Sequence, residues 1–208
     1  MPSKTLPAHT RQAYGVTFLS SQHKALRKLK SHDSQPSIHG NKFWGSTYLL
    51  MDYLSNNPLS TGSKVLELGC GWGAAGIFCA KHFDTEVIAV DADPAVFPYL
   101  NLHAEINQVD ITTAASYFED LRAEHLADID VIIGADICFW DELTDTLKHL
   151  IDMAIEAGVK KIILSDPERS PFLELAEHCV EEYFAELLPY NVDEPRRSSG
   201  CLLIIENA

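Results

Sequence analysis

The sequence predicts a doubly wound α/β fold, in which helices cover both faces of a mostly parallel sheet. Two observations support this prediction. Residues 64–73, with the sequence KVLELGCGWG, have the pattern of a buried strand that runs into a glycine-rich turn, and an apolar helical run follows at Ala74–Ala80. Further β-branched strand patterns then alternate with helical patterns along the chain. Such alternation is typical of parallel sheets, and a glycine turn between strand and helix builds a nucleotide-sized site at the carboxyl edge of the sheet.

Length and composition fit one domain. The chain has 208 residues, of which 46% are hydrophobic and 22% are charged, so a sizeable core is expected. The formal net charge of −14 argues against nucleic acid as the main partner, because phosphate binding requires a positive surface. Two interpretations of this acidity stay open, an ordinary acidic surface or a basic partner such as a lysine-bearing protein.

The cysteines and the hydropathy pattern indicate a cytoplasmic protein. The five cysteines are scattered, odd in number and without a CxxC pair, so neither a disulfide framework nor a metal site is expected. Residues 1–10 lack the apolar core of a signal peptide, and no run is long and apolar enough to cross a bilayer. We therefore expect reduced thiols and no membrane partner.

Residues 1–40 precede the α/β pattern and are expected to form an N-terminal appendage of helix and loop. A helix is predicted at Ser20–Leu29, and the proline and glycine of Ser31–Gly40 predict a loop. A lid or docking element and a simple packing appendage fit this segment equally well. Residues 41–208 are predicted to form the α/β domain.

The elements of that domain follow in order from residue 41. A helix at Tyr48–Asn56 is expected to be capped by Ser46 or Thr47. Asp93 is expected to cap the helix that follows the second strand, with Pro94 in its first turn. The predicted strands after the glycine turn are Glu86–Val90, Ile111–Tyr117, Asp130–Ala135 and Lys160–Ser165, and the predicted helices are Ala95–Asn107, Asp141–Ala157 and Phe172–Glu182. Two closing strands, Phe184–Pro189 and Cys201–Glu206, complete a sheet of seven strands as an antiparallel pair at its edge.

The spacing of the glycines distinguishes between two kinds of nucleotide site. A dinucleotide fold normally shows GxGxxG, whereas Gly69, Gly71 and Gly73 stand two residues apart and Glu67 precedes them at the same spacing. Asp91 ends the next strand about 20 residues past the turn, where an acceptor for ribose hydroxyls is expected. This E-x-G-x-G-x-G pattern, together with Asp91 and the closing strands, resembles the class I S-adenosylmethionine-dependent methyltransferases, which have a Rossmann-like seven-stranded sheet.

The resemblance implies S-adenosylmethionine as the cofactor. The backbone of the glycine turn would contact its methionine part, Glu67 its amino group and Asp91 its ribose. Phe118 and Glu119 would lie beside the adenine, at the end of the third strand. Trp44 would cover the cofactor, although an aromatic residue at such a place is otherwise a common core residue. The expected cofactor-binding residues are Trp44, Glu67, Gly69, Cys70, Gly71, Asp91, Ala92, Phe118, Glu119 and Asp136.

Three further stretches narrow the resemblance to the seven-β-strand protein-lysine methyltransferases, a group with bacterial members described as nicotinamide-methyltransferase-like. They are Phe43–Ser46 ahead of a helix, the acid-x-x-aromatic pattern within Gly134–Phe139, and Asp166–Arg169, which resembles a D-P-G-R stretch with Glu168 in place of glycine. The resemblance implies methyl transfer to a protein lysine, with Asp136 and Phe139 as the catalytic residues.

The roles of these residues follow from the chemistry of methyl transfer. Asp136 would hold and orient the acceptor amine through its N–H bonds, although a carboxylate also favours the charged amine. Phe139 and Trp140 would wall the acceptor channel, and packing at a helix start is the alternative for Trp140. Asp166 and Arg169 would line the same mouth, unless Asp166 serves as a helix cap.

Three other functions compete with this prediction. The first is an N-methyltransferase acting on a small amine or heterocycle. The second is a catalytically silent S-adenosylmethionine-binding module, against which the intact Glu67, Asp91 and Asp136 argue. The third is an NAD-dependent dehydrogenase, which the glycine spacing and the closing strands disfavour.

Overall fold

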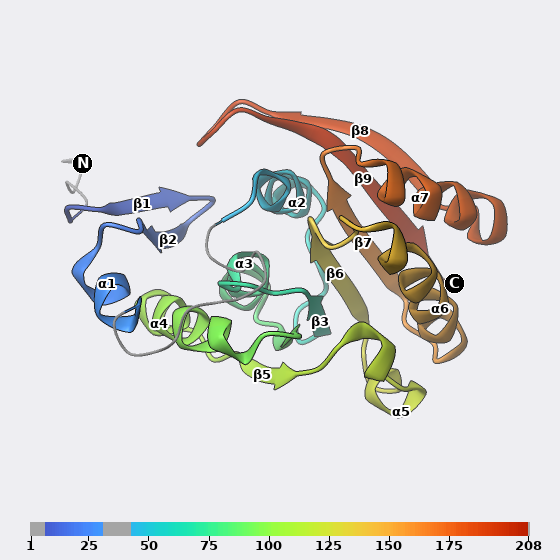
Figure 1. Ribbon diagram of the computed structural model, residues 1–208, viewed down its shortest axis with the longest axis horizontal. Coiled ribbons are helices and arrows are strands. Elements are labelled where there is room, and N and C mark those ends of the chain that lie inside the picture. The colour runs from blue at the N-terminus through green and yellow to red at the C-terminus, as the bar shows by residue number, and fades with distance from the viewer. Residues whose placement is uncertain (1–6, 31–42, 208) are drawn as a thin grey trace.

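A seven-stranded sheet forms the centre of the computed structural model, which describes residues 7–30 and 43–207 (Figure 1). The strands lie in the order β5-β4-β3-β6-β7-β9-β8. Their bounds are β3 (Lys64–Leu68), β4 (Glu86–Asp91), β5 (Thr112–Ala115), β6 (Val131–Ala135), β7 (Lys161–Asp166), β8 (Glu186–Val192) and β9 (Ser198–Glu206). Strands β3 to β7 are parallel, whereas β9 runs antiparallel to both β7 and β8. The predicted mostly parallel, Rossmann-like sheet with an antiparallel closing pair is therefore confirmed.

Strand β3 lies at the point where the order of the strands reverses. From β3 the chain proceeds outward to β4 and β5 on one side, and it then returns to β6 and β7 on the other side. The connection after β3 leads to a helix on one face of the sheet, and the connection after β6 leads to a helix on the other face. A crevice therefore forms between them, at the carboxyl ends of these two strands. The glycine turn after β3 and the residues after β6 therefore face one another.

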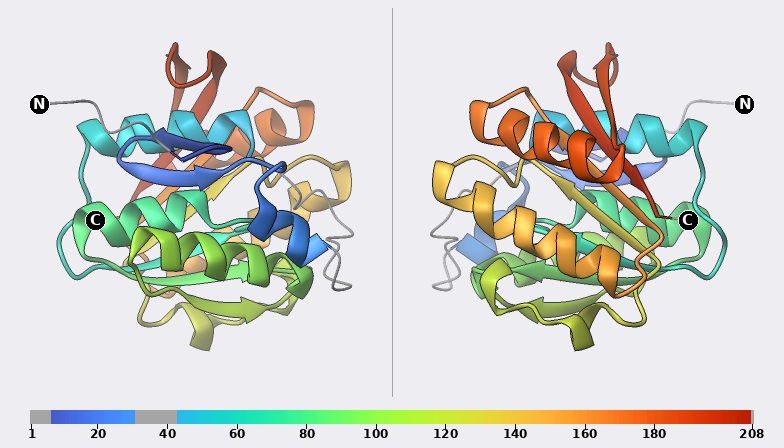
Figure 2. Two further views of the ribbon diagram at one scale, coloured as in Figure 1. Left: turned by 90° about the vertical axis from the view of Figure 1, so that its left-hand side faces the viewer. Right: turned by 90° about the vertical axis from the view of Figure 1, so that its right-hand side faces the viewer.

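Helices cover both faces of the sheet, as two views at right angles to Figure 1 make plain (Figure 2). One layer contains α2 (Gly45–Asn56), α3 (Ala74–Phe83) and α4 (Phe97–Asn107), and the other contains α6 (Asp141–Glu156) and α7 (Ser170–Tyr183). Val65 packs in the α2–α3 layer, whereas Leu66 and Leu68 pack on the α6–α7 side. Since neighbouring side chains of a strand point to opposite faces, burial on both sides explains why β3 is a continuous apolar run.

The start of α2 differs from its prediction. Neither Ser46 nor Thr47 caps it: the helix begins at Gly45 with Trp44 in the N-cap position and no side-chain cap. Neighbouring strands provide the missing partners instead. The N–H of Ser46 donates to Asp136 Oδ2 at 3.3 Å, and the carbonyl of Ser46 accepts from Ser165 Oγ at 2.9 Å. The first contact satisfies a backbone N–H of the first turn, as a side-chain cap would, and the second joins the start of α2 to β7.

The other predicted cap is confirmed. Asp93 Oδ1 accepts the N–H of Ala95 at 3.0 Å and caps a 3₁₀ turn, Pro94–Val96, that leads into α4.

The closing strands differ from their predicted bounds, because Phe184 does not begin a strand. It ends α7 in a left-handed conformation and is 93% exposed. The last strand, β9, lies between β7 and β8.

The N-terminal segment contains a hairpin that was not predicted, β1 (Thr10–Ala13) and β2 (Val16–Leu19). It is followed by α1 (Lys24–Lys30), which begins four residues later than the helix predicted at Ser20–Leu29 and ends one residue later. Side chains of α4 hold this hairpin. Asn107 Oδ1 accepts the N–H of Thr17 at 2.8 Å, and His103 Nε2 accepts the N–H of Leu19 at 3.2 Å. The predicted loop Ser31–Gly40 lies outside the described residues.

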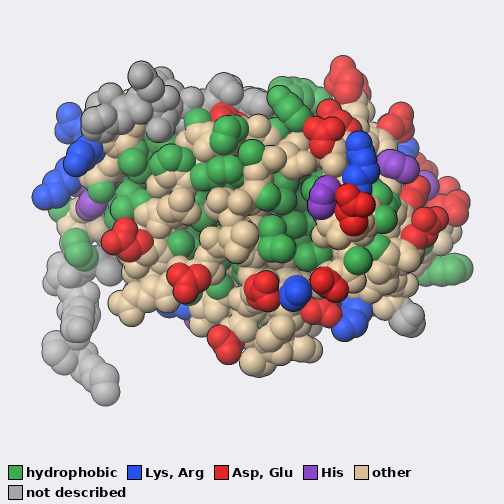
Figure 3. All heavy atoms as spheres, turned by 90° about the horizontal axis from the view of Figure 1, so that it is seen from below, with side chains coloured by type: hydrophobic (Ala, Val, Ile, Leu, Met, Phe, Trp, Pro, Cys, Tyr) green, Lys and Arg blue, Asp and Glu red, His purple; other side chains and the backbone are tan. Residues whose placement is uncertain are grey.

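Acidic and basic side chains are unevenly distributed on the face of the molecule that Figure 3 shows. Figure 3 shows acidic side chains scattered over one face and Lys and Arg gathered at its left edge, on the side where Figure 1 has α1. The last turn of α1 carries Arg27, Lys28 and Lys30. Within residues 7–30 and 43–207, no helix is long and apolar enough to cross a membrane, and no cluster of three His, Cys, Asp or Glu is placed to hold a metal ion.

Candidate functional site

A cavity of about 390 Å³ lies at the carboxyl ends of the central strands, and its volume is in the range of small-molecule sites. The structure brings every predicted site residue to its wall. They are Trp44, Glu67, Gly69, Cys70, Gly71, Asp91, Ala92, Phe118, Glu119, Asp136 and Phe139. Trp140 and Arg169, expected at the acceptor mouth, also line it, whereas the buried Asp166 does not. The residues that were not predicted are Phe43, Thr47, Trp72, Ala74, Tyr117, Ala135, Ile137 and Leu143.

Some of the unpredicted lining residues have a signal in the sequence, and others have none. Trp72 and Ala74 belong to the glycine motif itself, and Ile137 follows Asp136 directly, so proximity to a motif was a usable signal. Leu143 offered none, because it stands inside α6 and reaches the cavity only through the packing of that helix. Thr47 lies in the first turn of α2, where its residue type predicts a helix cap rather than a cavity wall.

The glycine turn brings backbone to the cavity wall. Gly69 has φ +59°, and a Cβ there would meet Ile137 Cγ2 at 2.7 Å, so the turn passes too close to Ile137 for any other residue. Gly71 has φ +51°, and no heavy atom lies within 4 Å of the place of its absent Cβ. Its backbone is therefore open to a ligand. Burial raises the pKa of the Cys70 thiol well above its ordinary value, which argues against a reactive thiolate.

Asp91 is held at the end of β4 as an oriented acceptor. Its Oδ2 accepts the N–H of Gly71 at 2.9 Å, and its Oδ1 accepts the N–H of Asp93 at 3.0 Å. Burial raises the pKa of Asp91, while these two N–H donors oppose the rise. Because each carboxylate oxygen keeps a second lone pair, the side chain can accept two hydroxyl protons without losing its anchoring contacts.

Glu67 is the least satisfied carboxyl group of the site. The residue is 5% exposed, and its Oε2 has no hydrogen-bond partner in the described part of the chain. Burial raises its pKa to about 8, the backbone N–H groups of Gly76 and Ala75 oppose the rise, and the nearby negative charge of Asp91 adds to it. A buried oxygen without a partner costs free energy until a donor satisfies it. Glu67 therefore offers a site for a cationic or hydrogen-bonding group of a ligand.

Two tryptophans at the cavity have different surroundings. Trp72 is 4% exposed and stacks on Tyr99, with ring centroids 5.3 Å apart and planes 3° apart. Phe43 meets the Trp72 ring edge-on at 5.2 Å. Trp44 is only partly buried and lies at the start of α2, so it faces the cavity and is not a core residue.

Asp136 occupies the opposite wall, directly after β6. Its backbone is left-handed, with φ +61°, and its N–H donates to the carbonyl of Ser165 at 2.9 Å. Both carboxylate oxygens have partners. Oδ2 accepts the N–H of Ser46, and Oδ1 lies 2.8 Å from Arg169 Nη2. Asp136 is therefore a fixed, charge-paired group.

Asp166 completes this arrangement from the end of β7. Its Oδ1 accepts the backbone N–H of Arg169 at 2.8 Å, and its Oδ2 lies 2.7 Å from Arg169 Nη1. Arg169 is the N-cap residue of α7 and no side chain of the described residues caps this helix, so the first contact fixes the turn before α7, and Asp166 is not its cap. Burial raises the pKa of Asp166 to about 6, and Arg169 opposes the rise.

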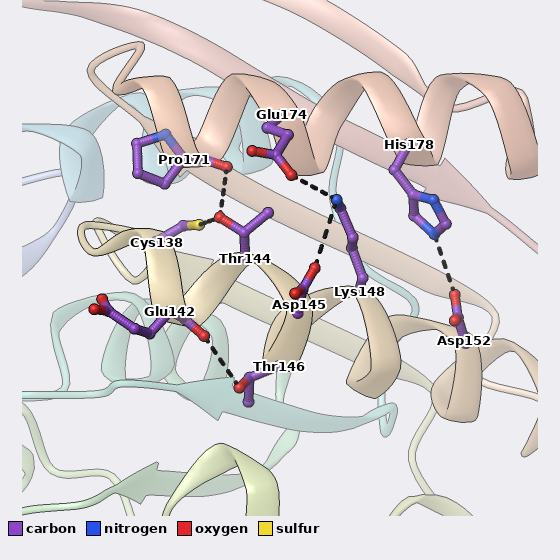
Figure 4. Close-up of polar contacts among 10 residues, drawn as sticks. All are labelled: Cys138, Glu142, Thr144, Asp145, Thr146, Lys148, Asp152, Pro171, Glu174 and His178. Carbon is purple, nitrogen blue, oxygen red and sulfur yellow. Dashed lines mark hydrogen bonds and ion pairs between the residues drawn. The ribbon is translucent and has the colours of Figure 1, made fainter.

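Contacts between α6 and α7 fix the loops that carry Asp136 and Arg169 (Figure 4). Thr144 Oγ1 donates to the carbonyl of Pro171 at 3.3 Å and lies 4.0 Å from Cys138 Sγ. Further along, Lys148 Nζ pairs with Glu174 at 2.8 Å. Thr144 thus joins the loop after β6 to the start of α7.

Exposed aromatic and acidic side chains surround the mouth of the cavity. Tyr117 is 54% exposed and Trp140 is 49% exposed, and both line the cavity. The Trp140 ring contacts the Phe139 ring at 4.5 Å. Glu119 and Asp141, next to these aromatic residues, are exposed. An apolar rim with negative charges suits a basic segment of a partner better than an acidic one.

Comparisons with known proteins relate this chain to lysine methyltransferases. A family model described as lysine methyltransferase matches residues 23–187. The electron transfer flavoprotein beta subunit lysine methyltransferase of Xenopus laevis is 28% identical over 159 residues, which cover 76% of this chain and 63% of that protein. The calmodulin-lysine N-methyltransferase of Arabidopsis thaliana is 26% identical over 140 residues, which cover 63% of this chain and 46% of that protein.

Solved structures share the fold at low sequence identity. TrmN from Thermus thermophilus has a TM-score of 0.61 at 15% identity, with 78% of this chain and 49% of that chain covered. The tRNA (uracil-54, C5)-methyltransferase of Pyrococcus abyssi, solved in complex with S-adenosyl-L-homocysteine, has a TM-score of 0.58 at 18% identity, with 94% of this chain and 42% of that chain covered.

Proposed function

The chain belongs to the lysine methyltransferase family, and from this premise we propose that it is an S-adenosylmethionine-dependent N-methyltransferase that acts on a lysine side chain of a protein. The chain spans 50–63% of the length of the first curated relatives it matches. The observation that carries the proposal is the single cavity whose walls hold Glu67, the glycine turn and Asp91 on one side and Asp136 on the other.

The residues present fit S-adenosylmethionine. Glu67, with its unpartnered Oε2, would receive the ammonium group of the methionine part. The open backbone at Gly71 would approach that part, and Asp91 would accept the ribose hydroxyls. Phe118 and Glu119, which line the same cavity, would flank the adenine.

The protein contributes to methyl transfer mainly by positioning the acceptor amine relative to the methyl group. When bound, S-adenosylmethionine supplies a methyl group on a positively charged sulfur. The nitrogen lone pair of the acceptor must lie in line with the carbon–sulfur bond, so the chain has to orient the amine and exclude water. Asp136, whose oxygens each keep a free lone pair, would accept an N–H bond from the amine. Phe139 and Trp140 would wall its channel, and the surplus proton would leave to water.

A protein acceptor is supported by the rim of the cavity. The exposed Tyr117 and Trp140 and the acidic residues beside them offer more contact area than a small amine requires. The net charge of −14 favours a basic segment and disfavours nucleic acid. Relatives named as lysine methyltransferases support the same acceptor.

Two further parts of the proposal concern location and domain division. All five cysteines are free, as is usual in a reducing compartment, which supports a cytoplasmic protein. We assign the methyltransferase domain to residues 41–208 and regard the described part of residues 1–40 as an extension built onto it. In support, Val16 and Phe18 of β2 are buried with α2 and α3.

A labelling experiment tests the function. The purified chain is incubated with S-adenosylmethionine carrying a tritiated methyl group and a cell lysate, which is then separated by size. We expect label in a protein band, on lysine by mass spectrometry; label confined to small molecules would contradict the protein acceptor. Calorimetry should detect binding of S-adenosylmethionine and none of NAD, and a failure to bind S-adenosylmethionine would refute the cofactor.

A further inference from the structure

A row of two carboxylates and one guanidinium lies on the acceptor side of the cavity, with Asp136 and Arg169 in its wall and Asp166 behind them. The Arg169 guanidinium stands between Asp136 and Asp166, with Nη2 2.8 Å from one carboxylate and Nη1 2.7 Å from the other. The three side chains are 29%, 5% and 0% exposed, in that order. Water therefore screens these charges poorly, and each acts strongly on its neighbours.

Arg169 has a special place among the charges of the cavity. Of the lining residues in the described part of the chain, it is the one that is positively charged, and it contacts the carboxylate expected to hold the acceptor. The acceptor amine attacks only as the neutral base. A carboxylate beside an amine stabilises the protonated form and thereby delays loss of the proton.

We infer that Arg169 controls the protonation state of the acceptor amine: by pairing with Asp136 it cancels much of that carboxylate's field, so the bound amine releases its proton to water at a lower pH. This inference rests on the proposed function. Arg169 acts as a positioning residue, since it works through Asp136. Asp166 weakens this effect, because its negative charge pairs with the same guanidinium and offsets part of the positive charge that Asp136 experiences.

Other charged and titratable groups surround this row and also contribute to the electrostatic potential at the acceptor amine. Those on the cavity wall are Glu67, Cys70, Asp91, Tyr117 and Glu119, and those near the row itself are Cys138, Glu168, Glu174 and Cys201. None of them is a cation, so none replaces Arg169 when it is removed.

Three variants separate this role from a structural one. Arg169→Met removes the charge, Arg169→Lys keeps it, and Asp166→Asn frees the guanidinium for Asp136 while its Oδ1 still accepts the Arg169 N–H. The readout is the pH dependence of kcat at saturating acceptor, using the protein band that the wild type labels. That profile reports groups in the bound complex.

In Arg169→Met, we expect the rising limb of the kcat profile to move to higher pH by about one unit. This shift corresponds to a roughly tenfold change in the protonation equilibrium of the bound amine. The limb should move to lower pH in Asp166→Asn and stay within about half a pH unit of the wild type in Arg169→Lys. These positions are compared independently of the absolute value of kcat in each variant. Opposite shifts distinguish an electrostatic effect from loss of structure. An unmoved limb in Arg169→Met, or a shift in the same direction in Asp166→Asn, overturns the inference.

A binding measurement provides a readout independent of turnover. With S-adenosylhomocysteine present at pH 7, n-butylammonium should bind Arg169→Met about tenfold more tightly than the wild type, by ligand-observed NMR, because the wall has lost a positive charge. Equal or weaker binding to Arg169→Met refutes the proposed role. If the wild type transfers no methyl group, the proposed function fails first and the inference falls with it.

Discussion

Substitution of Glu67 by glutamine should change how the stability of the protein depends on pH. The carboxyl group has an ordinary pKa of 4.5, which burial raises to about 8 in the folded protein. Between these values the folded state keeps a proton that the unfolded state has released. The unfolded state therefore binds fewer protons, and the free energy of unfolding falls as the pH rises through this window. Glu67→Gln preserves the size of the side chain and removes the titration.

The magnitude follows from the two pKa values. Each pH unit inside the window costs about 1.4 kcal/mol, so the wild type should lose about 3 kcal/mol relative to Glu67→Gln between pH 5 and pH 7.5. Comparison of the two proteins at each pH cancels the contributions of groups that do not interact with Glu67. Since Glu67 is 5% exposed, little of this effect is lost to solvent.

Urea unfolding followed by circular dichroism at half-unit pH steps measures this difference. Glu119→Gln is the matched control, because Glu119 lines the same cavity but is exposed, and its curve should run parallel to the wild type within about 0.5 kcal/mol. Parallel curves for the wild type and Glu67→Gln would refute a raised pKa at Glu67.

The same carboxyl group should report the arrival of the cofactor. If the cofactor's ammonium pairs with Glu67, binding at pH 7 expels the bound proton, so up to one proton is released per molecule bound. Calorimetry in two buffers of different ionisation enthalpy counts these protons. Glu67→Gln should release none, and an absence of release from the wild type would contradict the assignment of Glu67 to the ammonium group.

Three further predictions test other parts of the molecule. Asp91→Ala should weaken S-adenosylmethionine binding at least tenfold by calorimetry, because two hydroxyl contacts are lost, and unchanged affinity would remove Asp91 from the ribose site. Trp140→Ala should raise KM for the labelled protein several-fold while Kd for S-adenosylmethionine stays the same; an unaltered KM would exclude the rim as a docking surface. Burial lowers the pKa of His103 to about 4, so the wild type should lose up to about 3 kcal/mol relative to His103→Gln as the pH falls from 6.5 to 4, and urea unfolding of both proteins at each pH measures that difference.

Much of the α/β domain was predictable because its signals are local. The strands β3, β4, β6 and β7 are mostly apolar runs bounded by turns, and the glycine spacing identified the turn at the cavity wall. The wrong cap of α2 shows where this approach stops. Ser46 has the right chemistry for an N-cap, but its backbone is satisfied by Asp136 and Ser165, which are distant in the sequence.

The N-terminal hairpin was missed for a related reason. Its backbone is held by Asn107 and His103 of α4, residues 84 to 90 positions away. Short strands such as β1 and β2 have weak patterns of their own, and tertiary contacts stabilise them. No window of the sequence contains both partners of those contacts.

The sequence by itself determined the sheet, the glycine turn and most of the residues around the cavity, because period, turn chemistry and motif spacing are properties of neighbouring residues. Only the tertiary structure decided the electrostatic state of those residues. The pair Asp166–Arg169 lies three residues apart, but Asp136 meets Arg169 because β6 and β7 lie side by side. Glu67 likewise becomes a raised-pKa group only when the packed layers exclude water from it, since desolvation depends on everything that surrounds a side chain.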